Sequence, residues 1–390
     1  MPNENISEYT GLILVSGQDR PGITEKLMKV LSPFSIKILD IEQLIIRDRV
    51  ILTVLIVLNP DHALAIAKDL EEFEKDSDLD IAVDFTEHVD QISLSDSLIV
   101  VIIGEGVRAS AIAAIASEIA KLGGNIQSIR RTANNPIKAI ELQLSISNQS
   151  IKDVQRQLAL VAGANKIDMA VEQGGKVRSL KRVVLLDMDS TFIQQEVIDL
   201  LAQHAGQADA VKKITSQAMN GEIDFHQALI ERVSLLKGLS EDVIESTRRE
   251  LTLTKGVEEL ISKLHFYGHK VGVVSGGFIN VIEPMLKSLN IDFYRANALE
   301  IIDGKLTGKI IGEIIDKNAK LKALKEFAEE NKVNLQQSIA IGDGANDIEM
   351  IQAAGLGISF NAKPKVIAAA DTNLTSADLS SVLLLMGISS

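Results

Sequence analysis

The sequence predicts an α/β protein: a doubly wound, Rossmann-like parallel-sheet domain with a helical cap, preceded by two smaller α+β modules. Three observations support this. From residue 182 onward, short apolar runs alternate with helical patterns, as in parallel βα units. The stretch 194–253 is rich in helix formers and lacks a strand-like run, so we expect an inserted cap. The first 173 residues repeat one order of strands and helices. The expected domains are residues 1–90, 97–173 and 181–390, with the cap at about 200–252.

Composition narrows the class of protein. The 390 residues are 46% hydrophobic and 24% charged, which is typical of a globular chain with a substantial core. The formal net charge of −13 and the aromatic content of 3% argue against a nucleic-acid partner. The chain contains no cysteine, so thiol nucleophiles, disulfides and zinc–thiolate sites are excluded. No signal peptide or membrane-spanning run is visible, so we expect a cytoplasmic protein without a membrane partner.

The two N-terminal modules share the order βαββαβ. In each, an apolar run leads into a glycine, Gly17 in the first copy and Gly104 in the second, and a helical pattern follows. This order repeats after about 86 residues and places two helices on one face of an antiparallel sheet, which is the ferredoxin-like plan. The expected strands are 12–15, 35–46, 50–58 and 79–85 in the first copy, and 98–101, 125–131, 137–146 and 166–171 in the second.

A dinucleotide-binding turn is an alternative for residues 104–109, because glycines follow a strand there and a helix begins. The first copy keeps the same layout without that glycine pattern. The strand-like runs that follow come in pairs and do not form a parallel βαβ series. We therefore favour the ferredoxin-like interpretation for both copies.

The C-terminal domain carries its polar residues where strands end. Asp187 and Asp189 follow the buried run 183–186, and Asp343 ends the run 338–341. Ligands of open α/β sheets bind beyond the carboxyl ends of the strands. Two carboxylates held this close repel each other unless a cation or a shared proton intervenes. Oxygen ligands without histidine or cysteine favour Mg²⁺, so we expect a magnesium site at this edge.

Further segments add anion-binding groups. Ser275, Gly276 and Gly277 end another strand, and glycines allow backbone N–H groups to approach an anion closely. Lys320 or its neighbour Lys317 supplies a cation at the start of a helical run. Together with a metal, these groups describe a cradle for a phosphoryl group, which a carboxylate could attack.

These segments resemble the four motifs of the haloacid dehalogenase superfamily, and most fully its phosphoserine phosphatases. The motifs are Asp187-Met188-Asp189-Ser190-Thr191, Ser275-Gly276-Gly277, Lys320 and Gly342-Asp343-Gly344-Ala345-Asn346-Asp347, and the resemblance covers roughly residues 185–358. In the first module, Asp19-Arg20-Pro21-Gly22 resembles the loop before the first helix of ACT domains, which sense amino acids. The second module has Glu105-Gly106-Val107-Arg108 at the corresponding place.

The resemblance implies roles for individual residues. Asp187 would be the nucleophile, and Asp189 would be the general acid and then the base. Glu196 would bind the ammonium group of phosphoserine, and Arg232 on the cap its carboxylate. The remaining roles are Mg²⁺ binding by Asp187, Asp189, Asp343 and Asp347, phosphoryl binding by Ser275, Gly276 and Lys320, and substrate or phosphate contact by Asn346.

The resemblance also implies partners and leaves alternatives open. Serine or another amino acid would bind the first module through the loop of Asp19 and Gly22, and ACT-like sheets favour a homodimer. A related phosphatase or phosphotransferase with another small phosphorylated substrate is the nearest alternative. A sensor that uses the phosphatase-like domain only as a scaffold is a more distant one.

Overall fold

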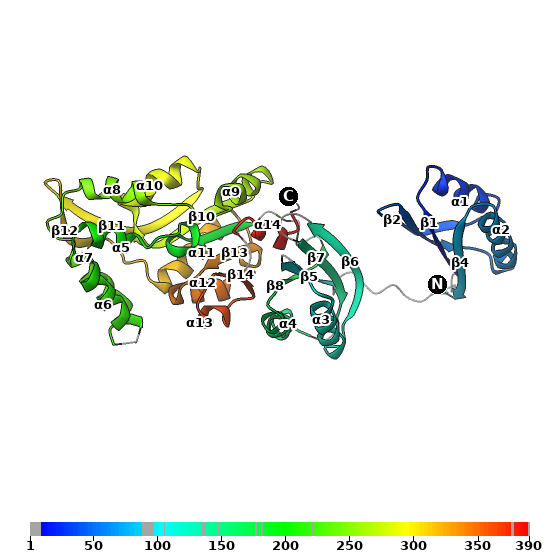
Figure 1. Cartoon of the computed structure of the whole chain (residues 1–390), viewed down its shortest axis with the longest axis horizontal. Coiled ribbons are helices and arrows are strands. Elements are labelled where there is room, and N and C mark those ends of the chain that lie inside the picture. Colours follow the sequence, from blue (N-terminus) through cyan, green and yellow to red (C-terminus); the bar gives the residue numbers. More distant parts are fainter. Residues whose placement is uncertain are drawn as a thin grey trace, which may run out of the picture. The chain divides into compact units, whose positions relative to one another are not determined.

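The computed structural model describes residues 9–87, 97–104, 106–133, 138–146, 149–175, 178, 180, 182–219, 222–375 and 378–388. The chain divides into two compact units, residues 1–92 and 93–390. The division falls near the expected boundary between the two modules, and residues 88–96 lie outside the described residues. The fold class predicted from the sequence is confirmed in both units (Figure 1).

The first unit is a four-stranded antiparallel sheet with two helices on one face. The strand order is β2-β3-β1-β4, and the inner face packs on the helices through a core that includes Ile13, Leu27 and Ile66. On the other face, alternate residues of β1 such as Leu12 and Leu14 are exposed. The elements are β1 (Tyr9–Gln18), α1 (Ile23–Leu31), β2 (Lys37–Ile46), β3 (Arg49–Val57), α2 (Ala63–Lys75) and β4 (Leu79–Glu87).

The second module repeats this plan. Its sheet has the order β6-β7-β5-β8, and all of its ladders are antiparallel. The strand before Gly104 therefore belongs to a ferredoxin-like sheet, and the dinucleotide-binding alternative is wrong. The elements are β5 (Ser97–Gly104), α3 (Ala109–Lys121), β6 (Asn125–Ala133), β7 (Lys138–Ser145), α4 (Ile151–Asn165) and β8 (Asp168–Gln173).

The outer face of the second module is buried, unlike that of the first. Ile99, Val101 and Ile103 of β5 belong to the same hydrophobic core as α14 (Ser381–Leu385) of the C-terminal domain. Ion pairs add to this packing, because Glu172 of β8 binds both Arg178 and Arg182, and Arg182 immediately precedes the central strand of the C-terminal sheet. The second module and the C-terminal domain therefore share a hydrophobic core.

The C-terminal domain is built on a seven-stranded sheet with the order β12-β11-β10-β9-β13-β14-β15. All its ladders are parallel except the β11–β12 hairpin, which turns at Asp303–Gly304 as the sequence predicts. Its strands are β9 (Val183–Asp187), β10 (Lys270–Phe278), β11 (Phe293–Ile302), β12 (Lys305–Ile311), β13 (Ser338–Gly342), β14 (Leu356–Phe360) and β15 (Thr372–Leu374).

Four helices lie between β9 and the helix that leads into β10, in agreement with the expected cap. They are α5 (Val197–His204), α6 (Ala208–Met219), α7 (Phe225–Ser234) and α8 (Asp242–Glu250). The remaining helices are α9 (Val257–Phe266), α10 (Ile279–Ser288), α11 (Lys317–Glu330), α12 (Ile348–Ala353) and α13 (Pro364–Ile367). Among the described residues, no helix combines the length and the apolar character needed to cross a bilayer.

Candidate active site

The site forms where three neighbouring parallel strands end. β9 lies between β10 and β13, so its carboxyl end faces polar turns on both sides. Val183 to Leu186 are fully buried, which is why an uninterrupted apolar run precedes Asp187 in the sequence. After Asp187 the chain enters an irregular turn, Met188–Phe192, in which Ser190 has a φ of 59°.

Asp189 is held by donors from two other elements. Its Oδ1 accepts the N–H of Val197, at the start of α5, at 2.8 Å, and its Oδ2 accepts the hydroxyl of Ser275 at 3.0 Å. Burial, and then the negative charge of Glu196, raise the pKa of Asp189 to about 7. A carboxyl group with that pKa can both donate and accept a proton near neutral pH.

Lys320 is the cation at the centre of the site. Its side chain is 0% exposed, and its Nζ lies 2.5 Å from Asp187 Oδ1 and 2.6 Å from Asp347 Oδ1. Burial alone would lower the pKa of Lys320, but the charges of Asp187 and Asp347 outweigh burial and raise it. Lys320 therefore stays protonated.

Lys320 and its neighbour Lys317 lie on different faces of α11. Asp316 caps α11 by accepting the N–H groups of Asn318 and Ala319, each at 2.9 Å. Lys320 then lies on the buried face of the helix, whereas the partly exposed Lys317 forms an ion pair with Glu349 at 2.8 Å. Lys317 is thus engaged away from Asp187.

Asp187, Asp343 and Asp347 form an acidic cluster. Each offers one carboxylate oxygen, and these three oxygens lie within 4.8 Å of one another. Asp343 also accepts the hydroxyl of Thr191 at 3.0 Å, and Asp347 accepts the N–H of Gly344 at 2.9 Å. The cluster fits a hard divalent cation, because it offers only oxygen ligands with fixed orientations.

Burial is also the main reason why two carboxyl groups of the cluster have raised pKa values. It raises the pKa of Asp187 well above its usual value, and the charge of Asp347 raises it further, against the opposing effect of Lys320. Burial and the charge of Asp347 raise the pKa of Asp343 to about 6. One lysine does not neutralise this group of carboxylates, which is a second reason why the residues fit a bound cation.

The turn after β10 brings Ser275 and two glycines to the same edge. The hydroxyl of Ser275 accepts the N–H of Gly277 at 2.7 Å, which closes the turn. A Cβ atom at Gly277 would lie 2.8 Å from Asp189 Oδ2, so a larger residue there would displace the Asp189 carboxyl group. The predicted phosphoryl-binding residues Ser275 and Gly276 therefore lie beside Asp189.

The two predicted substrate-recognition charges lie close together at the cap side of the site. Glu196 accepts the hydroxyl of Ser190 at 2.9 Å. Arg232 of α7 is half-buried and donates through Nε to the carbonyl of Ala228 at 3.1 Å. Burial lowers the pKa of the Arg232 guanidinium, and the nearby charges of Glu196 and Asp199 oppose that effect.

The predicted residue Asn346 and the cap residue Phe225 lie less directly on this cluster. Asn346 lies in the short turn Ala345–Asp347, directly after the Gly344 amide that binds Asp347. Phe225 of the cap reaches the phosphoryl-binding turn, because a Cβ atom at Gly276 would lie 3.5 Å from its ring.

Sequence reasoning missed Thr191 and Asn297 as contributors to the site. Thr191 stands in a motif that we singled out, yet we assigned no role to its hydroxyl, which binds Asp343. Asn297 lies within a strand and carried no sequence signal. Its buried amide binds the backbone of Gly276 and Ile315.

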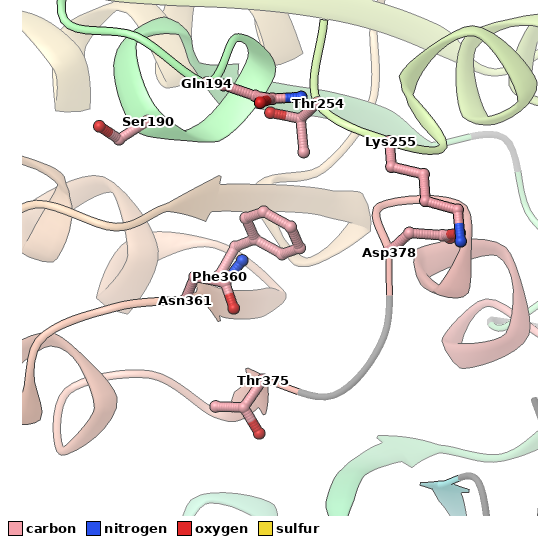
Figure 2. Close-up of a pocket in the computed structure, with 8 residues that line it drawn as sticks. All are labelled: Ser190, Gln194, Thr254, Lys255, Phe360, Asn361, Thr375 and Asp378. Atoms are coloured by element: carbon pink, nitrogen blue, oxygen red, sulfur yellow. The ribbon is translucent and has the colours of Figure 1, made fainter.

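A polar cavity of about 500 Å³ lies beside the turn Met188–Phe192 (Figure 2). Among the described residues, its lining takes Ser190 from this turn and includes none of the predicted site residues. At one edge of the cavity, the side chains of Lys255 and Asp378 lie next to each other and form an ion pair at 3.5 Å (Figure 2). The lining residues are Ser190, Gln194, Thr254, Lys255, Phe360, Asn361, Thr375 and Asp378.

The fold and the site define a hydrolase class. Residues 184–352 match the haloacid dehalogenase-like hydrolase family, and residues 10–84 and 97–172 each match an ACT domain family. The protein is therefore a hydrolase of this superfamily with two N-terminal ACT domains.

Similar proteins define the class more narrowly. The chain is 40% identical to a phosphoserine phosphatase of Mycobacterium tuberculosis, over 97% of this chain and 93% of that protein. The crystal structure of a probable phosphoserine phosphatase from Vibrio cholerae is 32% identical and has a TM-score of 0.59, covering 77% of this chain and 89% of that one. A structure described as a phospho-aspartyl intermediate analogue of phosphoserine phosphatase is 42% identical and has a TM-score of 0.50, covering 53% of this chain and 98% of that one. The chain belongs to the phosphoserine phosphatase family, and it is a phosphatase.

Proposed function

We propose that the protein hydrolyses O-phospho-L-serine to serine and inorganic phosphate through an aspartyl-phosphate on Asp187. The observation that carries this proposal is the arrangement of Asp187 between the buried cation Lys320 and the acidic cluster, with Asp189 two residues away on a strained turn. Glu196 and Arg232 supply the two charges that a phosphorylated amino acid requires.

In the first step, an oxygen of Asp187 attacks phosphorus and the bond between phosphorus and the serine oxygen breaks. The departing oxygen takes its proton from Asp189. Asp189 is partly protonated near neutral pH, because burial raises its pKa to about 7. In the second step, Asp189 accepts a proton from the water that attacks the aspartyl-phosphate, and this restores both carboxyl groups. Lys320, the Ser275 hydroxyl and the Gly276 amide bind the phosphoryl oxygens, and Asn346 contacts substrate or phosphate.

We further propose that Mg²⁺ is the cation. The side chains of Asp187, Asp343 and Asp347, with the backbone carbonyl of Asp189, would hold it. When bound, Mg²⁺ would offset the negative charge of the carboxylates and of the phosphoryl group, which otherwise repel each other.

Substitution of the nucleophile tests the mechanism. Asp187→Asn removes the attacking oxygen and should lower phosphoserine turnover by about 10³-fold or more, because the covalent step is lost. Phosphate release measures turnover, and mass spectrometry of acid-quenched enzyme detects the phosphorylated carboxyl group. Asp303→Asn, in the exposed hairpin turn, is the control and should match the wild type. Wild-type turnover by Asp187→Asn would contradict the assignment.

A panel of phosphomonoesters tests whether Glu196 and Arg232 recognise phosphoserine. It decides between phosphoserine hydrolysis and activity on another small phosphorylated substrate. Phosphoserine should be preferred over sugar phosphates, with activity lost when Mg²⁺ is chelated. Glu196→Gln and Arg232→Ala should each lower kcat/KM for phosphoserine by about 10²-fold, while simple phosphomonoesters change little.

The control for this panel is Arg249→Ala, since Arg249 is an exposed cation of the cap helix α8 that pairs with Glu245. If both site variants keep the wild-type preference, the protein is a phosphatase or phosphotransferase for another small phosphorylated metabolite. Zero turnover on every substrate by folded wild type would favour the sensor alternative.

We propose that serine or another amino acid binds the first module. The loop of Asp19 and Gly22 leads into α1, where Gly22 has a φ of 93° and precedes the first helical residue. The N–H of Asp19 donates to the carbonyl of Asp48 at 2.7 Å, which ties this loop to the β2–β3 turn. A defined loop beside a helix N-terminus suits the carboxylate of an amino acid.

Calorimetry on the full chain tests this site. Serine should bind, and Asp19→Ala should weaken its affinity by about tenfold, because the carboxylate that pairs with the ammonium group is lost. Asp61→Ala, an exposed acid of the same module, is the control and should leave binding unchanged. If neither serine nor any of a set of other amino acids gives a heat of binding, this proposal is wrong.

We also propose that the enzyme is a homodimer formed through the first module. Leu14, Leu44 and Ile51 lie on the outer face of its sheet and are 42%, 56% and 43% exposed. The equivalent face of the second module, with Val101, is buried against the catalytic domain. An apolar sheet face of this kind favours association with a second copy.

Sedimentation tests the homodimer. Wild type should have the mass of two chains, and Leu44→Asp should shift it towards one chain, because a charge then enters the apolar interface. Leu64→Asp replaces an 86% exposed residue on the helical face and should remain a dimer. A monomeric wild type, or equal behaviour of both variants, would contradict the proposed interface.

A further inference from the structure

Asn297 occupies a break in the catalytic sheet. The parallel ladder between β10 and β11 runs from Gly272 opposite Phe293 to Ser275 opposite Ala296, and it resumes with Phe278 opposite Asn297. Gly276 and Gly277 therefore have no partner residue in this ladder. The strand bulges at this point, and the Gly277 N–H donates to the Ser275 hydroxyl instead of to β11.

The side chain of Asn297 replaces the missing ladder bond. It is 1% exposed, and its Nδ2 donates to the carbonyl of Gly276 at 2.8 Å. A buried carbonyl left without such a donor would destabilise the turn. The peptide between Gly276 and Gly277 is thus held by a side chain from the neighbouring strand, and its N–H donates to the Ser275 hydroxyl.

The other end of the same amide reaches the segment that carries Lys320. Asn297 Oδ1 accepts the N–H of Ile315 at 2.9 Å. Ile315 directly precedes Asp316, which caps α11, and Lys320 lies in the first turns of that helix. One planar amide therefore connects the Gly276 turn to the start of the Lys320 helix.

We propose that Asn297 is a positioning residue that sets the Gly276 turn and Lys320 at a fixed separation around the phosphoryl group. This inference rests on the proposed phosphoryl-binding roles of Gly276 and Lys320. Asn297 does not touch the substrate in this arrangement. It acts on the two groups that do, and a displacement of either by a fraction of an ångström weakens the transition state more than the ground state.

The chemistry of the two bonds restricts the residue. One end must donate to a carbonyl and the other must accept from an N–H, so the side-chain amide is the matching group at this length. Aspartate keeps the acceptor but places a second oxygen against the Gly276 carbonyl. Serine is neutral and too short to span both partners.

The chain offers a matched control in Asn280 of α10. Its Oδ1 accepts the N–H of Leu299 at 2.8 Å, and its Nδ2 donates to the carbonyl of Leu299 at 3.3 Å. Asn280 therefore also ties an element to β11 through both amide atoms, but these two bonds go to Leu299 and not to Gly276 or Ile315. Substitution of Asn280 reports the general cost of losing such a bridge.

The experiment compares Asn297→Asp and Asn297→Ser with Asn280→Asp and Asn280→Ser in the full chain. We expect both Asn297 variants to lower kcat for phosphoserine by about 10–100-fold with a smaller change in KM, and to weaken inhibition by inorganic phosphate by about tenfold. The Asn280 variants should change these values by less than about threefold at a similar loss of thermal stability. The aspartate variants both break the bridge and add a charge, whereas the serine variants only break the bridge. Comparing them separates the effect of the lost bridge from the effect of the added charge.

The outcomes distinguish this inference from the proposed function. Equal effects of the Asn297 and Asn280 substitutions, or unchanged phosphate inhibition in Asn297→Ser, would overturn the positioning role. If wild type neither hydrolyses phosphoserine nor is inhibited by phosphate, the proposed function fails, and this inference fails with it. If Asn297→Asp does not fold, Asn297→Ser carries the comparison.

Discussion

The site depends on one buried contact, the amino group of Lys320 between the carboxylates of Asp187 and Asp347. The charges of Asp187 and Asp347 outweigh the effect of burial on the pKa of Lys320 and raise it, so the buried lysine keeps its charge. The same contact fixes the orientation of Asp187, the proposed nucleophile. The remaining negative charge, from Asp343 and Asp189, explains why the site suits a divalent cation as well as a lysine.

Sheet topology makes this contact possible. Because β9 is flanked by parallel strands on both sides, its carboxyl end faces the turns after β10 and β13 simultaneously. The helix that carries Lys320 begins immediately after the hairpin of β11 and β12, and its cap, Asp316, sets the helical phase. A buried carboxylate, a glycine turn and a lysine therefore meet without any long loop.

The sequence could predict the parts of the site that local patterns encode. Asp187, Asp189 and Asp343 follow apolar runs, so their position at strand ends is readable. The choice between Lys320 and Lys317 was also readable in principle, because Ala323, Leu324 and Phe327 recur three, four and seven residues after position 320. The pairing of Asn297 with Gly276 was not, because it depends on a bulge between strands that are distant in sequence.

The two ACT-like modules have the same fold but differ in what covers the outer face of the sheet. In the first module Leu12 and Leu14 are 39% and 42% exposed, whereas in the second Ile99 and Val101 stand at the same places in the strand and are 7% and 1% exposed. The second sheet is therefore occupied on both faces, by its own helices and by the catalytic core. Arg182 joins Glu172 of that module to the base of β9, the strand that ends at Asp187. The first module, whose outer face is exposed, is the one that can offer an apolar surface to a second copy.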